Sequence, residues 1–178
     1  MLIAQGIWLE IRAASYLQIQ TEEMPMKTLI LGIGNFFLGD EGLGAHAARK
    51  LIKEELPRET KVLEVETSIL DTLADLENAD RVILLDAIKA DGEPGTVYRL
   101  CIERCESPND IAAMHSLDIF AVLALSGRNK PGEVVALGIE PARQEWKSHL
   151  SPEVSRALPF LVDSVKRELN GEQPYFQL

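Results

Sequence analysis

Three short runs of large apolar residues constrain the fold of this chain more than any other feature. They span residues 28–33, 81–85 and 133–139. Each run is strand-sized, and segments with helical spacing of apolar residues follow, such as the stripe Leu43, Ala47 and Leu51. Strands that are almost continuously apolar and alternate with helices are typical of a mostly parallel sheet covered on both faces.

Weaker patterns complete the predicted architecture. Residues 61–67 alternate as a half-buried strand, and residues 96–100 predict a further strand after the turn at 92–95. A last helix begins near Pro152, with an apolar face, and another helix is predicted over residues 116–125. The sequence therefore predicts an α/β fold with five strands and helices on both sides, a three-layer α/β/α sandwich.

The predicted domain organisation is a single α/β domain over residues 26–170, with an N-terminal extension at 1–25 and a tail at 171–178. The extension mixes apolar residues with few turn signals. It fits an added helix or strand, a self-association arm, or sequence upstream of a true start at Met24 or Met26. These alternatives stay open.

Composition excludes several classes of partner. The formal net charge of −10 disfavours nucleic acids and anionic membranes, because the overall field repels phosphate. No apolar run reaches the roughly 20 residues that span a bilayer, and the first 25 residues lack the basic start of a secretory signal. Cys101 and Cys105 lack the partners of a structural zinc site and are expected to be reduced thiols. We therefore expect a cytoplasmic protein without membrane insertion.

Two carboxylates are the strongest candidates for chemistry. Glu41 lies in the glycine-rich segment after the first apolar run, and Asp86 directly follows the second. Side chains just past the carboxyl ends of neighbouring strands line the ligand crevice of open α/β sheets. A structural turn at Asp86 and a favourable charge–dipole interaction of Glu41 at a helix start are the alternative interpretations.

The glycine-rich segment does not match a nucleotide-binding loop. Phe37 occupies a position where the dinucleotide fingerprint needs glycine. Gly34 and Gly39 match the outer glycines of a Walker loop, but Asp40 and Glu41 follow in place of Lys and Ser or Thr. Two acids at this point repel phosphate, so no nucleotide cofactor is expected.

Neighbouring residues of this segment have structural interpretations. Asp40 is predicted to cap the following helix at its N-terminus. Gly42 and Gly44 weaken a helix, which indicates that a backbone or a ligand approaches closely there. Asn35 either ties the loop through side-chain hydrogen bonds or only occupies a turn. His46 is expected on the water-facing side of the helix.

His115 is the third candidate, because it opens a predicted helix after a loop. A lone histidine is more often a surface or packing residue. Together with two carboxylates, an imidazole makes a plausible set for a borderline divalent ion, with positions left open for water or substrate.

Several motifs taken together resemble the hydrogenase maturation endopeptidases, which process the large subunit of nickel–iron hydrogenases. The resemblance extends from Met26 to about Leu169 in the expected order and spacing. The motifs that carry it are Gly32–Asn35, Asp40–Gly44, Leu85–Ala87, Gly92–Thr96, His115 and Gly138–Pro141.

The resemblance implies a fold, a ligand set and a substrate. The sheet order would be 2-1-3-5-4 with the fourth strand antiparallel, and the metal-contacting residues would be Glu41, Asp86 and His115. The substrate would be a nickel-loaded [NiFe]-hydrogenase large-subunit precursor, from which the enzyme, expected as a monomer, removes a short C-terminal extension. Nickel would be presented by this precursor, so that metal loading becomes a condition for cleavage.

The mechanism of hydrolysis and two competing functions remain open at this stage. No serine or cysteine lies in a recognisable nucleophile motif. Metal-assisted attack of water, with Asp86 or Glu41 as the general base of an aspartic-type endopeptidase, is the preferred prediction. A non-catalytic metal-sensing chaperone that binds the precursor tail would use the same three ligands. A generic metallopeptidase acting on small peptides is the third alternative.

Overall fold

The computed structural model describes residues 26–65, 69–101, 131–143 and 146–172 of the 178-residue chain. The strands are β1 (Thr28–Ile33), β2 (Thr60–Val65), β3 (Arg81–Ala87), β4 (Val97–Cys101) and β5 (Glu133–Ile139). The helical elements are η1 (Gly39–Gly42), α2 (Leu43–Leu51), η2 (Ile69–Thr72), α3 (Leu73–Glu77) and α6 (Pro152–Leu169). The predicted extension at 1–25, Cys105, the helix at 116–125 and most of the tail lie outside the described residues.

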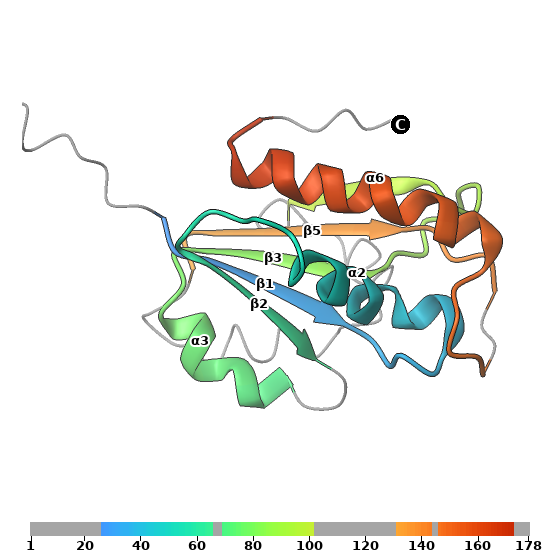
Figure 1. Cartoon of the computed structure of the whole chain (residues 1–178), viewed down its shortest axis with the longest axis horizontal. Helices are drawn as coiled ribbons and strands as arrows, with labels where there is room; N and C mark the ends of the chain where they lie inside the picture. Colours follow the sequence, from blue (N-terminus) through green and yellow to red (C-terminus); the bar gives the residue numbers. More distant parts are fainter. Residues whose placement is uncertain (1–25, 66–68, 102–130, 144–145, 173–178) are drawn as a thin grey trace, which may run out of the picture.

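The five strands form one sheet in the order β2-β1-β3-β5-β4. Strands β1, β2, β3 and β5 pair in parallel, and β4 pairs antiparallel to β5. Figure 1 shows the four parallel arrows running toward the same side of the molecule. The predicted sheet order and the antiparallel fourth strand are therefore confirmed.

Alternate residues of each central strand face two separate hydrophobic clusters. Ile30 and Ile83 face the side covered by α2 and α6, where Leu43 and Leu161 pack against them. The opposite side is covered in the described region by α3, which contributes Leu76. Helices thus lie on both faces, as the continuous apolar strands required. Within the described residues, no helix is long and apolar enough to cross a membrane.

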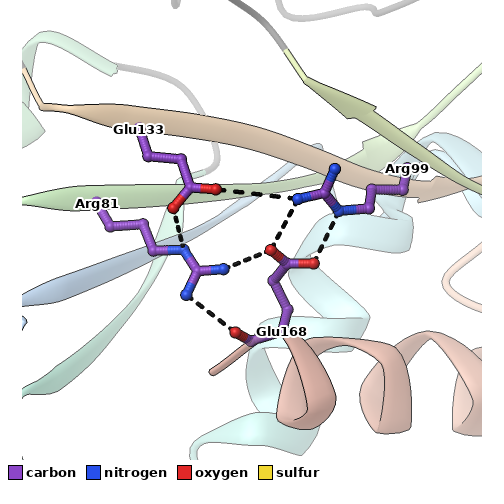
Figure 2. A network of polar contacts seen from close by, with 4 residues as sticks. All are labelled: Arg81, Arg99, Glu133 and Glu168. Atoms are coloured by element: carbon purple, nitrogen blue, oxygen red, sulfur yellow. Dashed lines mark hydrogen bonds and ion pairs between the residues drawn. The ribbon is translucent and has the colours of Figure 1, made fainter. Parts of the chain in front are cut away.

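A buried ion network closes the edge of the sheet where β3 and β5 begin, which we call the amino edge. Glu168 of α6 contacts both Arg81 and Arg99 (Figure 2). Arg99 donates from Nε to Oε2 of Glu168 at 2.8 Å, and Arg81 donates to the Glu168 backbone carbonyl at 2.9 Å. Glu133 completes the network with an ion-pair contact of 3.1 Å to Nε of Arg81, which is not aligned as a hydrogen bond.

The charges in this network balance each other, with two guanidinium groups facing two carboxylates. Burial acts to raise the pKa of Glu168, but the hydrogen bonds from Arg99 and the charges of Arg99 and Arg81 outweigh it, so the pKa lies below its ordinary value. The hydrogen bond to Glu168 raises the pKa of Arg99 in turn. Both partners are therefore held in their charged forms.

Candidate active site

The opposite edge, where the parallel strands end, is here called the carboxyl edge, and it holds both predicted carboxylates. Asp86 lies near the end of β3, opposite Gly138 of β5, and is only 1% exposed. Glu41 lies in η1, which follows β1 and packs against β3. Its side chain keeps 20% of its surface exposed. The two acids thus come from elements at the ends of neighbouring strands, as predicted.

Glycines allow the start of α2 to sit directly on the ends of β1 and β3. A Cβ atom on Gly44 would lie 2.1 Å from the Ile33 carbonyl oxygen and 2.2 Å from that of Leu85. One on Gly42 would lie 2.6 Å from the Asn35 carbonyl oxygen. The predicted close approach is confirmed, and backbone atoms make it. Larger residues here would push Glu41 away from the end of β3.

Asp40 does not cap a helix, so this prediction was wrong. Leu38 occupies the N-cap position of η1, and no side chain caps that helix. Asp40 is buried, and its carboxylate accepts hydrogen bonds from the backbone N–H groups of Ala142, Arg143 and Ser151, at 2.9, 3.3 and 2.7 Å. It therefore joins the segment after β5 and the start of α6 to the segment that carries Glu41.

Asn35 ties the loop before η1, which resolves the two alternatives left open for it. Its Oδ1 accepts a hydrogen bond of 2.9 Å from the backbone N–H of Phe37. Gly34 precedes it with a φ of 131°, a conformation that other residues rarely adopt. The turn is therefore specified by the order of these two residues.

His46 faces the protein rather than water, contrary to the prediction. Its ring stacks on Phe36 with 4.2 Å between centroids. Burial and the nearby charge of Arg49 lower the pKa of His46. Arg49 itself is exposed, and its guanidinium lies 4.0 Å from the Phe36 ring centroid. Stacking on Phe36, in the loop before η1, therefore keeps the His46 ring away from the solvent.

Glu140 belongs to the motif Gly138–Pro141, and its role in the site was not predicted from the sequence. It follows β5, is buried, and its Oε2 accepts hydrogen bonds from the N–H groups of Ala90 and Gly92, at 2.9 and 3.3 Å. The hydroxyl of Tyr98 donates to the same oxygen at 2.9 Å. Glu140 thus fixes the loop that follows Asp86. Glu140 could have been predicted from the sequence, because it is an acid directly after an apolar strand, the same pattern that identified Asp86.

The Tyr98 hydroxyl is a constant hydrogen-bond donor to the Glu140 carboxylate. Burial and the hydrogen bond to Glu140 raise the pKa of its phenol to about 12. The phenol therefore stays protonated at any physiological pH and holds the Glu140 carboxylate in place.

Lys89 lies on the loop that Glu140 fixes, and its ammonium faces Glu41. The distance from Nζ of Lys89 to Oε1 of Glu41 is 3.8 Å. The Lys89 side chain is 41% exposed, so solvent screens this pair. A cation at this point links the loop after Asp86 to η1 and shows that the space beside Glu41 accommodates positive charge.

The third predicted ligand, His115, lies outside the described residues. In the ranges that are described, no group of three His, Cys, Asp or Glu residues is placed to hold a metal ion. Glu41 and Asp86 are hard, oxygen-donor residues at one edge of the sheet, which suits two of three ligands for a divalent ion. The complete ligand set, and with it the placement of His115, stays a prediction.

Comparison with known proteins identifies the family. The family model of hydrogenase maturation proteases (HycI) matches residues 45–168, more than half of the chain. A protein of Methanocaldococcus jannaschii assigned to these proteases is 33% identical over 151 residues, which cover 79% of this chain and 95% of the relative. The chain belongs to the hydrogenase maturation protease family.

Solved structures agree with this membership. The hydrogenase-maturating endopeptidase HybD of Escherichia coli aligns with a TM-score of 0.69 and 27% identity, over 82% of this chain and 93% of HybD. The [NiFe] hydrogenase maturation protease HycI of Thermococcus kodakarensis aligns with the same TM-score at 18% identity, over 86% and 99% of the two chains, and shows the fold alone. The family resemblance drawn from the motifs is confirmed, and membership favours a peptidase over the non-catalytic chaperone.

Proposed function

We propose that this hydrogenase maturation protease is an endopeptidase that removes the C-terminal extension of a nickel-loaded [NiFe]-hydrogenase large-subunit precursor. The observation that supports the proposal most is the placement of Glu41 and Asp86 at the ends of adjacent elements of the carboxyl edge, in a chain of this family. We place the reaction in the cytoplasm, on the basis of the sequence alone.

In this proposal, some residues of the chain would bind the nickel ion and others would hold those residues in position. Glu41 and Asp86 would contact the nickel ion of the precursor, together with His115. Nickel belongs to the substrate in this proposal, and it would polarise the scissile carbonyl when the precursor is bound. Asp86 or Glu41, when not occupied as a ligand, would accept the proton of the attacking water.

Two further carboxylates would keep this arrangement rigid. Asp40 holds the segment after β5, and Glu140 holds the loop after Asp86. Both are satisfied by hydrogen-bond donors of the protein, so their role is to position the elements that carry Glu41 and Asp86. A preorganised site of this kind lowers the reorganisation needed in the transition state.

The test is incubation of the purified enzyme with a candidate precursor in two forms, nickel-loaded and metal-free, followed by intact-mass measurement. We expect one defined C-terminal peptide to be lost from the nickel-loaded form only. Equal cleavage of both forms would contradict the nickel requirement but not the protease assignment. Cleavage of unrelated small peptides at a similar rate would instead favour a generic metallopeptidase.

A further inference from the structure

Two large aromatic side chains are exposed beside the carboxyl edge, on segments that are far apart in the sequence. Phe37 is 62% exposed and Trp146 is 84% exposed. Each immediately precedes one residue of an isolated parallel bridge between Leu38 and Lys147. The Gly39 N–H donates to the Lys147 carbonyl at 2.6 Å, which holds the two segments side by side. We call Phe37 and Trp146 the aromatic rim.

The backbone beneath this rim is held in place on both segments. Phe36 packs against His46 and Arg49, and Asn35 accepts a hydrogen bond from the Phe37 N–H. On the other segment, the Asp40 carboxylate holds residues on either side of Trp146, at Arg143 and Ser151. In Figure 1, the segment leading into α6 lies beside the loop that precedes η1. The rings are thus exposed on a fixed frame.

A cavity of about 340 Å³ adjoins the same two segments. Its lining includes Asp40 and three basic side chains, those of Arg143, Lys147 and His149. The cationic side chains of Arg143 and Lys147 outnumber the single Asp40 carboxylate, which is engaged by three backbone N–H groups, so the net formal charge of this lining is positive. In a chain with a net charge of −10, this local excess favours an acidic group.

The aromatic rim lies close to Glu41 in the sequence, and this position indicates what the rim binds. Phe37 lies four residues before Glu41, and the adjoining cavity includes the two residues directly before Glu41. Single exposed apolar residues are ordinary, but two exposed aromatics on hydrogen-bonded neighbouring segments form a surface suited to protein binding, and tryptophan is enriched among the residues that contribute most to such binding.

We propose that the aromatic rim and the adjoining basic cavity bind the segment of the substrate precursor next to the bond that is cut. That segment would be extended, with an apolar side chain on Phe37 and Trp146 and an acidic side chain in the cavity. This inference rests on the proposed function, because it takes the hydrogenase precursor as the substrate.

A first experiment uses Trp146 as its own reporter. The chain contains two tryptophans, Trp8 and Trp146, so the substitution Trp8→Phe leaves one emitting group at the rim. Titration with the nickel-loaded precursor should shift the Trp146 emission to shorter wavelength as the ring leaves water. The precursor's own tryptophan signal is subtracted by a parallel titration with the double variant Trp8→Phe/Trp146→Phe.

A second experiment compares exposed aromatics at two places. Phe37→Ala and Trp146→Ala should each raise KM for precursor cleavage about fivefold to tenfold, with kcat within about twofold, because contacts of this kind contribute more than 1 kcal/mol to binding. Phe160→Ala is the matched control, since Phe160 is 69% exposed on α6, outside the rim and its cavity. It should leave both constants unchanged.

A charge reversal tests the cavity in the same assay. Lys147→Glu should raise KM by about tenfold or more, whereas Lys53→Glu, at an exposed position outside the cavity, should not. Thermal unfolding of every variant confirms that it is folded.

The outcomes separate this inference from the function on which it rests. If the precursor is cleaved normally but the emission does not shift and the rim variants keep the wild-type KM, the docking surface is wrong and the protease assignment stands. If no precursor is cleaved by the wild-type enzyme, both are overturned. Equal effects of Phe160→Ala and Trp146→Ala would also overturn the docking surface.

Discussion

The two edges of the sheet bury acidic side chains in opposite ways. At the amino edge, Glu168 is met by two guanidinium groups, those of Arg81 and Arg99, so its charge is neutralised inside the fold (Figure 2). At the carboxyl edge, Asp40 and Glu140 are held mainly by backbone N–H groups, and Glu41 faces Lys89 across 3.8 Å. The first arrangement stabilises the fold, and the second positions the loops around Glu41 and Asp86, the two carboxylates that we propose as ligands.

This contrast predicts that charge removal at the amino edge has the largest effect on stability. Glu168→Ala should lower the free energy of unfolding by about 3–5 kcal/mol, because it leaves the buried Arg81 guanidinium with only the partly exposed Glu133 carboxylate beside it. Urea denaturation measures the loss. Asp163→Ala is the control, since Asp163 is 61% exposed in its ion pair with Arg167 and should change stability by less than about 0.5 kcal/mol. Equal losses in both variants would break the comparison.

Asp86→Asn should show the opposite pattern, with a large loss of cleavage activity and little change in stability. Cleavage of the nickel-loaded precursor is expected to fall by about 100-fold or more, because a ligand or general base is lost while the shape of the side chain is kept. Single-turnover cleavage, followed by intact mass, measures this rate. Its urea denaturation midpoint should remain near that of the wild-type enzyme. Full cleavage by the variant would remove Asp86 from the catalytic assignment.

Asp40→Ala should lower both the stability and the cleavage rate. It is therefore intermediate between Glu168, which affects stability, and Asp86, which affects cleavage. Loss of the carboxylate that accepts hydrogen bonds from three backbone N–H groups should cost about 2–3 kcal/mol of unfolding free energy. The rate of cleavage should fall as well, since the segment after β5 is no longer tied to η1. Paired denaturation and cleavage measurements test this. A variant that loses activity at unchanged stability would place Asp40 in the chemistry instead.

Acid should weaken the amino edge through Glu168. The pKa of Glu168 is lower in the folded protein than its ordinary value of 4.5, so the unfolded chain binds the proton more readily. The stabilisation is therefore complete above about pH 5 and is lost as the pH falls through the folded pKa. We expect the stability difference between wild type and Glu168→Gln to shrink below pH 4.5 in urea denaturation across a pH series. A constant difference would contradict the assignment.

The smallest effect is expected at Lys89. Removal of its charge by Lys89→Met should leave stability unchanged and should strengthen binding of Ni²⁺ to the free enzyme about two- to fivefold, the range of a screened surface ion pair. Calorimetric titration with Ni²⁺ measures this change. Lys89→Arg, which keeps the charge, is the control. Weaker binding by the Met variant would show that Lys89 supports the site rather than competing with the cation.

Local patterns predicted the elements of this fold and two of its candidate site residues. The apolar runs became β1, β3 and β5, and the helical stripes became α2 and α6, because burial imposes its periodicity directly on the sequence. Glu41 and Asp86 were found because acids rarely follow such runs without a reason. The sheet order, by contrast, came from the family resemblance, since strand periodicity carries no information on crossovers.

The tertiary structure alone decided what the other charged groups do. Asp40 was expected to cap its own helix, but its donors lie more than 100 residues away. Glu168 meets Arg81 and Arg99 only after α6 packs across β4 and β5. A side chain's hydrogen-bond partner depends on which distant backbone is brought within about 3 Å, and no local pattern encodes that distance.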